Sequence, residues 1–529
     1  MRDRAPHGRA VRLPHPGALV ALGLAGLAAL SFGTLIGAAE EPAGALALDA
    51  YTRRILVFAL TQALISTCLS LVLGAALALA LARRRFPGRD LALAALGAAA
   101  VMPAIVVVFS VVAVYGRSGW IGQAMALVGL DARPNPFGWT GILIAHVFLN
   151  AALAARVCLD ALARAPAEHW RLAAILGFGP GATFRHLDWP ILKSEFPGLA
   201  GLVFLLCFTS FAIVLTLGGG PGKATLEVAI FEALRVELDF ARAAVLAGLQ
   251  LAVCLSLTLL LHWAVTRAPI APTERLPVAR PDAADPRLRR LDALVLALGA
   301  GLILPLLAAT LPGAAALPRV LDADLAYAAG VSVAIALVSA SLACLFALAL
   351  AAAAQRARAA RAARRAAAYD VLPAMVLAIP PFALTAGLFL ALRGLVNPTQ
   401  AGFVLLPLVN AIGALPFAYR FLAPALATTA SRYGRLADLL GLTGLSRLAI
   451  VDWPTLRRPF AGAFALCAAL SFGDFGIVAL FGGGALRTLP YLLYERLGSY
   501  RLDEAAAIGL ILVTTAFLLA ALAARMARC

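Results

Sequence analysis

Long apolar runs, each of about 20 residues, alternate with short polar connections along the whole chain. An α-helix of that length crosses roughly 30 Å of hydrocarbon, the thickness of a bilayer core. The runs lie near residues 18–39, 55–82, 91–115, 139–162, 197–217 and 243–265, and again near 291–312, 326–354, 370–392, 401–422, 460–481 and 505–524. Strands of a transmembrane barrel would instead alternate apolar and polar positions over about ten residues. The pattern predicts an all-α integral membrane protein with about twelve transmembrane helices, arranged as six and six.

A repeat in the sequence agrees with this division into two sets of six. The stretch from Arg171 to Pro190 returns 264 residues later, from Arg435 to Pro454, and eight of the 20 positions are identical. The identities include the Gly and the Asp-Trp-Pro that closes each copy. At the same offset, residues 210–214 match residues 474–478. A repeat of this period predicts two equivalent halves related by a pseudo-twofold axis along the membrane normal.

A short polar segment separates the two halves. Residues 266–290 are rich in Pro, Arg and Asp, unlike the apolar runs on either side. We therefore expect a first transmembrane half at 1–265, a cytoplasmic linker at 266–290 and a second transmembrane half at 291–529.

Composition and charge fix the expected orientation. The 529 residues are 62% hydrophobic and 13% charged, and the mean hydropathy is +0.92. Alternate connections, counted from the N-terminus, carry 30 Lys and Arg residues against 12 in the opposite set. The positive-inside rule then predicts that both termini and both repeated stretches are cytoplasmic. The first run follows four arginines, as a cleaved signal peptide would, but it is long and precedes no soluble domain, so we expect a retained helix.

The two repeated stretches occupy long cytoplasmic connections, at 163–196 and 423–459. Within each connection, leucine and isoleucine recur at helical spacing, which predicts a short amphipathic helix along the membrane surface. Gly177 and Gly441 follow these helices and are expected to adopt the left-handed C-cap conformation. Pro190 and Pro454 mark the start of the next segment.

The sequence argues against an enzyme and against a nucleotide site in this chain. Gly222-Lys223 resembles a phosphate-binding loop, but Leu217 stands where its first Gly is required and Ala224 where Ser or Thr should follow. Six dispersed His residues form no catalytic motif, and seven scattered Cys residues indicate neither a metal site nor a disulfide framework. The basic stretch 355–365 has no interleaved aromatics, so we expect no nucleic-acid partner.

One acidic residue lies within a predicted span. An ionised Asp474 would cost roughly 2.5–3.5 kcal/mol at the membrane centre, so it should face a partner or a wet cavity. A residue on a cation pathway and a packing hydrogen bond between Gly-flanked helices are both compatible with this position.

The duplicated stretch resembles the EAA loop of ABC importer permeases, in which EAA, three residues, Gly, nine residues, Ile, one residue and Leu-Pro follow in order. Gly177 and Gly441 keep that spacing to the closing Pro, whereas Arg171 and Arg435 replace the leading Glu. Trp189 and Trp453 replace the Leu before Pro. The resemblance implies a type I ABC importer permease fold in which these loops are coupling helices that dock on ATPase subunits. The implied coupling residues are Arg171, Leu172, Ala173, Gly177, Asp188 and Pro190, with Arg435, Leu436, Ala437, Gly441, Asp452 and Pro454.

Further stretches make the whole chain similar to the fused permeases of thiamine and thiamine-pyrophosphate ABC importers. They include residues 83–89, 114–120, 208–221, 470–482 and 487–501. The resemblance implies a multi-pass inner-membrane permease that works with two copies of a cytoplasmic ABC ATPase and a periplasmic binding protein. The chain itself would bind no cofactor and no metal, because ATP is used by the partner subunits. Ser210, Phe211, Asp474 and Phe475 are the candidate pathway residues for thiamine, which is cationic and aromatic. Ferric iron is an alternative substrate, and a secondary transporter is an alternative class, although it would not need the two cytoplasmic loops.

Overall fold

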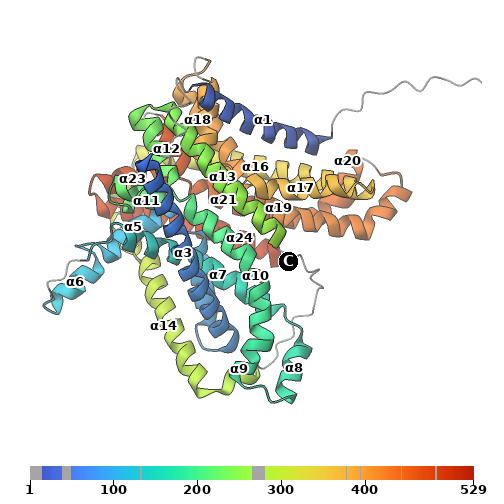
Figure 1. The fold of residues 1–529 in the computed structure, drawn as a ribbon, viewed down its shortest axis with the longest axis horizontal. Coiled ribbons are helices and arrows are strands. Elements are labelled where there is room, and N and C mark those ends of the chain that lie inside the picture. Colours follow the sequence, from blue (N-terminus) through green and yellow to red (C-terminus); the bar gives the residue numbers. More distant parts are fainter. Residues whose placement is uncertain are drawn as a thin grey trace, which may run out of the picture.

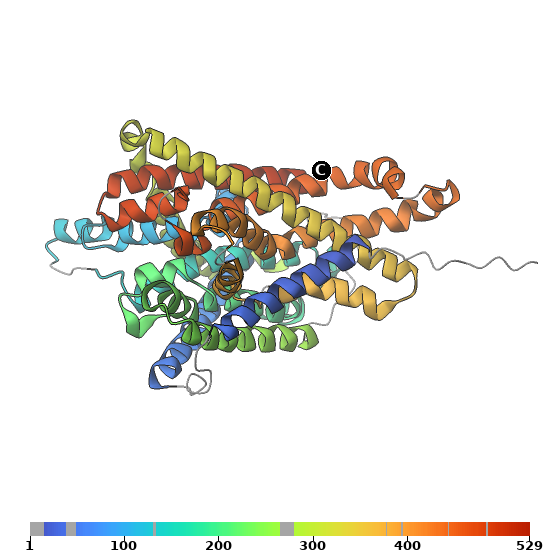
Figure 2. The ribbon, with the colours of Figure 1, turned by 90° about the horizontal axis from the view of Figure 1, so that it is seen from above.

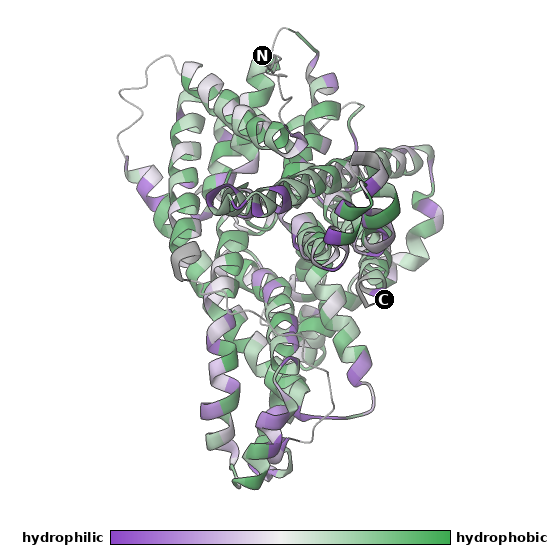
Figure 3. Cartoon of the chain, turned by 90° about the vertical axis from the view of Figure 1, so that its right-hand side faces the viewer, coloured by the Kyte–Doolittle hydropathy of each residue, from purple (hydrophilic) through white to green (hydrophobic). Residues whose placement is uncertain are grey.

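The computed structural model describes residues 15–38, 49–130, 134–264, 280–376, 378–392, 395–442, 444–482 and 485–528. Within these ranges the fold is built from helices (Figure 1). Eleven of the described helical segments are long and apolar enough to cross a membrane, and a bent pair supplies a twelfth. The expected all-α membrane fold is confirmed. Green, apolar residues dominate the helices, and purple, hydrophilic ones gather toward helix ends and connections (Figure 3).

The first half runs from α1 to α13. Its elements are α1 (Pro16–Gly37), α3 (Ala50–Arg83), α4 (Arg89–Val101), α5 (Ala104–Tyr115), α6 (Trp120–Leu127), α7 (Trp139–Ala163), α8 (Ala167–Ile175), α9 (Pro180–Thr183), η1 (Phe184–Asp188), α10 (Trp189–Phe208), α11 (Ala212–Leu217), η2 (Pro221–Lys223), α12 (Leu226–Glu232), η3 (Ala233–Glu237) and α13 (Phe240–Ala264).

The described part of the connection between the halves begins at residue 280, since residues 266–279 of the expected linker lie outside the described residues. The elements that follow are η4 (Pro281–Ala284), α14 (Pro286–Ala308), η5 (Leu311–Ala316), α15 (Leu317–Val320), α16 (Ala323–Ala359), α17 (Ala363–Val376), α18 (Pro381–Leu392), α19 (Pro398–Leu439), α20 (Gly444–Arg447), η6 (Leu448–Asp452), α21 (Trp453–Phe472), α22 (Gly476–Phe481), α23 (Leu489–Gly498) and α24 (Leu502–Arg528).

The same three-helix packing recurs in both halves. α3 packs on α7 and α10, and α16 packs on α19 and α21 in the same way. Small residues line these contacts: Gly74 of α3, for instance, faces Ala151, Ala154 and Ala155 of α7. Small side chains let helix backbones approach closely, which is how helices associate in lipid, where burial of apolar surface offers little gain.

The halves are interlocked by an exchange of their first helices. α1 packs on α16 and α18 of the second half, while α14 packs on α3, α4 and α5 of the first. Figure 2 shows α1, in blue, lying along the yellow and orange helices of the second half. Hydrogen bonds anchor this contact: Ser31 Oγ donates to Ala383 O at 2.8 Å, and Thr34 Oγ1 donates to Gly387 O at 2.6 Å.

The close contact between α1 and α18 leaves no room for a side chain at Gly387. A Cβ at Gly387 would overlap the backbone and hydroxyl of Ser31, whereas a Cβ at Gly33 of α1 meets nothing within 4 Å. We expect Gly387→Val to destabilise the chain by about 1–3 kcal/mol, because overpacking forces helices apart. Thermal unfolding of the detergent-solubilised protein should show a lower apparent Tm for Gly387→Val than for the matched control Gly33→Val. Equal Tm values would show that α1 tolerates displacement from α18.

Four of the predicted spans are broken in the structure. Run 91–115 divides into α4 and α5 at Pro103, which has no N–H to donate and disfavours helix at the residue before it. Its counterpart, run 370–392, divides into α17 and α18 ahead of Pro381. Runs 197–217 and 460–481 each lose their last turns to a separate short helix, α11 or α22. The apolar pattern did not reveal these breaks because both sides of each break are equally apolar.

Candidate functional site

The two repeated stretches form matching helix ends. Gly177 follows α8 with φ +64°, and Gly441 follows α19 with φ +65°. In each copy the next residue closes the helix: Phe178 N donates to Ala173 O and Leu442 N to Ala437 O, both at 2.9 Å. This is a Schellman arrangement, and the predicted left-handed glycine caps are confirmed.

Each of these helix ends presents the same exposed apolar face. The exposed fractions of Leu172, Ile175 and Leu176 are 55%, 82% and 60%. Their repeat partners are Leu436, Leu439 and Leu440, with exposed fractions of 55%, 84% and 65%. Ala173 and Ala437 are buried on the opposite face, while Arg171 and Arg435 are exposed. Such faces at equivalent positions are the expected form of a pair of docking surfaces.

The two copies differ in how they join the membrane helix before them. In the first half, α7 ends at Ala163 and α8 begins after Pro166, so the repeated stretch holds a separate short helix as predicted. In the second half, α19 runs unbroken from Pro398 to Leu439, and the prediction of a separate short helix is wrong there. Ala430 occupies the position of Pro166 in the second copy, and it neither lacks an N–H nor restrains the residue before it.

Both copies then return to the membrane through one turn of π-helix. η1 ends at Asp188 and η6 at Asp452, so Pro190 and Pro454 fall in the first turn of α10 and α21. π-helical turns are rare and concentrate at functional positions. In Figure 1, the segment holding α8 and α9 lies at the bottom and the segment holding α20 at the right, at the ends of two diverging groups of helices.

The two Asp residues have different surroundings. Asp188 is fully buried and accepts two hydrogen bonds from Arg280, at 3.0 and 2.7 Å. Burial opposes the charge on Arg280, but the hydrogen bonds that it donates to Asp282 and Asp188 outweigh this effect and raise the pKa of the guanidinium. Asp452 is partly exposed and lies 3.8 Å from Arg447. Sequence reasoning missed Arg280, because nothing in the sequence separates it from the other arginines of the linker.

The helix breaks bring the predicted pathway residues of both halves together. Phe211 and Phe475 precede α11 and α22, and their rings stack with centroids 6.0 Å apart. Because these two residues are repeat partners, a contact between them places them at the pseudo-twofold axis between the halves. Interrupted helices at a repeat interface are typical of substrate sites in transporters.

Further aromatic rings complete this cluster. Phe382 lies 4.3 Å and Phe231 5.2 Å from the Phe211 ring, and Tyr494 lies 4.8 Å from the Phe475 ring. These residues come from α18, α12 and α23, and Phe231 and Tyr494 are equivalent, since each lies five residues after the first residue of its helix. The signal for this pair is the Thr-Leu that opens both helices, at 225–226 and 488–489, where the offset is 263 because the preceding connection is one residue shorter in the second half.

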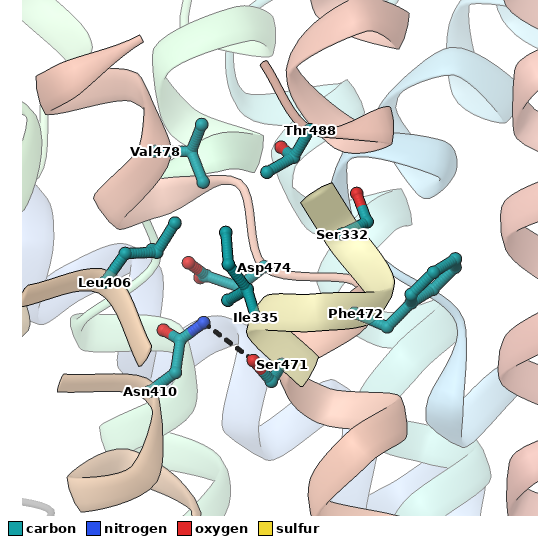
Figure 4. Close-up of a pocket in the computed structure, with 9 residues that line it drawn as sticks. All are labelled: Ser332, Ile335, Leu406, Asn410, Ser471, Phe472, Asp474, Val478 and Thr488. Carbon is teal, nitrogen blue, oxygen red and sulfur yellow. Dashed lines mark hydrogen bonds between the residues drawn. The ribbon is translucent and has the colours of Figure 1, made fainter. Parts of the chain in front are cut away.

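Asp474 lies beside this cluster, at the edge of a narrow polar pocket. Its carboxyl neighbours the amide of Asn410 and the backbone N–H groups at the start of α22, and Oδ2 has no partner. Asn410 donates to Ser471 Oγ at 3.0 Å, as Figure 4 shows. Ser471 in turn donates to Ser339 at 3.0 Å. Ser210, the counterpart of Asp474, is half-buried, and its carbonyl accepts from Thr225 at 2.9 Å.

An equivalent polar contact lies in the first half. Ser66 Oγ is 3.2 Å from Nδ1 of His146, and His146 is the repeat partner of Asn410. The Nε2 atom of His146 has no partner. The first half thus joins α3 to α7 directly, whereas the second half joins α16 to α19 through Ser471 of α21.

Comparison with known proteins agrees with this geometry. No family model matches the chain. The thiamine transport system permease protein ThiP of Brucella melitensis is 42% identical over 506 residues, covering 93% of this chain and 92% of that protein. The proteins of the same name from Escherichia coli and Haemophilus influenzae are 39% and 35% identical, covering 89% and 88% of this chain. Such identity over nearly the full length of both proteins shows common descent, and the chain belongs to the family of thiamine transport system permease proteins.

Proposed function

We infer that the chain is the membrane-spanning permease of an ATP-driven importer that carries thiamine into the cytoplasm. The observation that carries this conclusion is the pair of repeated stretches within 163–196 and 423–459, which we call the coupling segments. Their apolar residues are exposed to the same extent at positions 264 residues apart. Two identical motor subunits require two matching contact sites, and the repeat supplies them. The relatives carry thiamine transport in their names, which favours thiamine over ferric iron.

The partners follow from the same segments. Two copies of a cytoplasmic ABC ATPase would dock on α8 and on the end of α19, burying Ile175 and Leu439 in a groove of each subunit. ATP would be bound and hydrolysed there, and the permease would act as a transport subunit rather than an enzyme. In this orientation both termini would be cytoplasmic, and the membrane would be the inner membrane.

A periplasmic binding protein would deliver thiamine at the opposite face. The segments 218–240 and 482–504 follow α11 and α22 along the chain. They carry exposed apolar residues at equivalent positions, since Leu238 and Tyr500 each lie two residues before the next helix with a left-handed backbone. Paired surfaces of this kind suit a partner that contacts both halves at once.

The cluster at the pseudo-twofold axis would form the path of the substrate. Closure of the ATPases would move the coupling segments together and tilt the two halves about the Phe211–Phe475 contact. Aromatic faces attract a cation, and the Asp474 carboxylate adds charge complementarity. Ser210 in the equivalent position carries no charge, so the path is asymmetric, as an asymmetric substrate requires.

A transport assay with purified components tests the proposal. The permease, the ATPase and the binding protein are reconstituted in proteoliposomes, and uptake of radiolabelled thiamine is measured with and without ATP. We expect ATP-dependent uptake that excess unlabelled thiamine suppresses and ferric iron does not. Uptake of ferric iron with no uptake of thiamine would overturn the substrate, and thiamine uptake that follows an ion gradient without ATP would overturn the class.

A further inference from the structure

A buried cluster of six charged residues joins the first coupling segment to the connection between the halves. Its cations come from the end of α3 and from residue 280, and its anions from η1, η4 and α14; the members are Arg83, Arg84, Arg280, Asp188, Asp282 and Asp292. Their side-chain exposures range from 0% to 15%. Three positive and three negative charges balance, which is the condition under which charges remain buried.

Arg280 contacts two parts of the first coupling segment, α8 and η1. Its guanidinium binds Asp188 of η1 through both oxygens, at 3.0 and 2.7 Å. It also covers the ring of Trp170 in α8, with 4.4 Å from Cζ to the ring centroid. The planar fork of Arg satisfies a bidentate ion pair and a ring stack at the same time, which Lys cannot do.

The cluster continues from Arg280 into the membrane helices. Asp282 accepts from Arg280 at 3.0 Å and lies 3.8 Å from Arg83. Arg83 and Arg84 both bind Asp292 of α14, each with a shortest contact of 2.7 Å. A displacement of α8 is therefore transmitted to the ends of α3 and α14, and not only along the chain into α10.

The second half connects its coupling segment to the membrane helices in another way. Its coupling helix is the end of the unbroken α19, so a displacement passes directly into that membrane helix. Arg447 contacts Asp438 at 3.3 Å and Asp452 at 3.8 Å, and the exposures of these Asp side chains are 73% and 14%. The exposed ion pair with Asp438 therefore contributes little to stability. Trp170 has Gly434 as its repeat partner, so the second copy also lacks the ring.

We propose that Arg280 is a positioning residue that braces the first coupling segment, replacing the helix continuity that Pro166 interrupts. The connection between the halves thereby becomes part of the mechanical path from the first ATPase to α3 and α14. This role rests on the proposed ATPase coupling for its effect on transport, but the brace itself is a property of the permease alone.

Hydrogen exchange on the full chain in nanodiscs, without ATPase or substrate, tests the brace directly. We expect Arg280→Ala to speed amide exchange in residues 167–190 by about ten-fold or more, because the segment then opens locally. Arg447→Ala, the matched control in the second half, should leave residues 167–190 unchanged. Where Arg280→Ala fails to fold, the neutral pair Arg280→Gln with Asp188→Asn removes the ion pair and leaves the two remaining cations and two remaining anions of the cluster in balance. Wild-type exchange in that pair would overturn the proposal.

Reconstituted transport tests the consequence. We expect Arg280→Ala to raise the ATP hydrolysed per thiamine imported by about three-fold or more, the scale of coupling changes along contact networks. Adding Pro166→Ala should return the ratio toward wild type, because α7 and α8 can then form one helix as α19 does. A wild-type ratio in Arg280→Ala, or no recovery with Pro166→Ala, would overturn the proposal. If the wild-type chain imports no thiamine, the proposed substrate falls while the hydrogen-exchange comparison still tests the brace.

Discussion

Replacing Gly177 and Gly441 together by valine should uncouple transport while leaving the chain inserted in the membrane. Both glycines hold a left-handed backbone, at φ +64° and +65°. A β-branched residue there costs about 1–2 kcal/mol, so each coupling helix would lose its Schellman end. Because the exposed apolar faces lie in the turn before these glycines, their angle to the ATPase would change. We expect ATP-dependent uptake in proteoliposomes to fall by about ten-fold or more.

The control for this experiment lies two residues away. Gly179 has an extended backbone, φ −75° and ψ 176°, and a Cβ there meets nothing within 4 Å. Gly179→Val should therefore transport like the wild type. Blue-native electrophoresis and membrane fractionation would show that the double variant is inserted and intact. Normal uptake in the double variant would contradict the assignment of these segments to coupling.

Changing Asp474 to asparagine should lower the transport of a cationic substrate. The side chain lies at the helix break beside the ring cluster, and its Oδ2 has no partner. An unpaired carboxylate in this surrounding attracts a cation strongly, since the local dielectric is low. Asparagine keeps the shape and the polar contacts and removes the charge. We expect thiamine uptake at subsaturating concentration to fall by about ten-fold.

The alternative role of Asp474, as a hydrogen-bonding group in helix packing, makes a different prediction. Asparagine would preserve such a contact, and uptake kinetics would then be unchanged. Asp90→Asn provides the matched control, because Asp90 is exposed in the first turn of α4, away from the cluster. A reduced rate in both variants would point to a general effect of charge rather than to the pathway.

The elements that sequence predicted well are those that depend on local pattern. The membrane helices follow from length and hydropathy, and the glycine caps follow from backbone freedom at Gly177 and Gly441. The repeat also identified Phe211 and Phe475 as equivalent residues, and the structure adds that their rings stack. These features needed no knowledge of which helices are neighbours.

The features that sequence did not predict depend on contacts between distant segments. Arg280 acquires its role only because the connection between the halves folds back on Asp188, 92 residues earlier. Phe382 and Phe231 join the ring cluster from α18 and α12, which lie outside the repeated stretches recognised in the sequence. The continuity of α19 through Ala430 was missed because the two repeat copies were expected to be alike. They differ here because the first copy has Pro166 where the second has Ala430.

The exchange of α1 and α14 bears on the order in which the protein is made. When synthesis has reached the end of α13, α3, α4 and α5 still lack α14, and α1 still lacks α16 and α18. Neither half can complete its packing until the ribosome has delivered helices of the other. The fused gene guarantees this supply in equal amounts, and two separately encoded halves would each wait in the membrane for a partner.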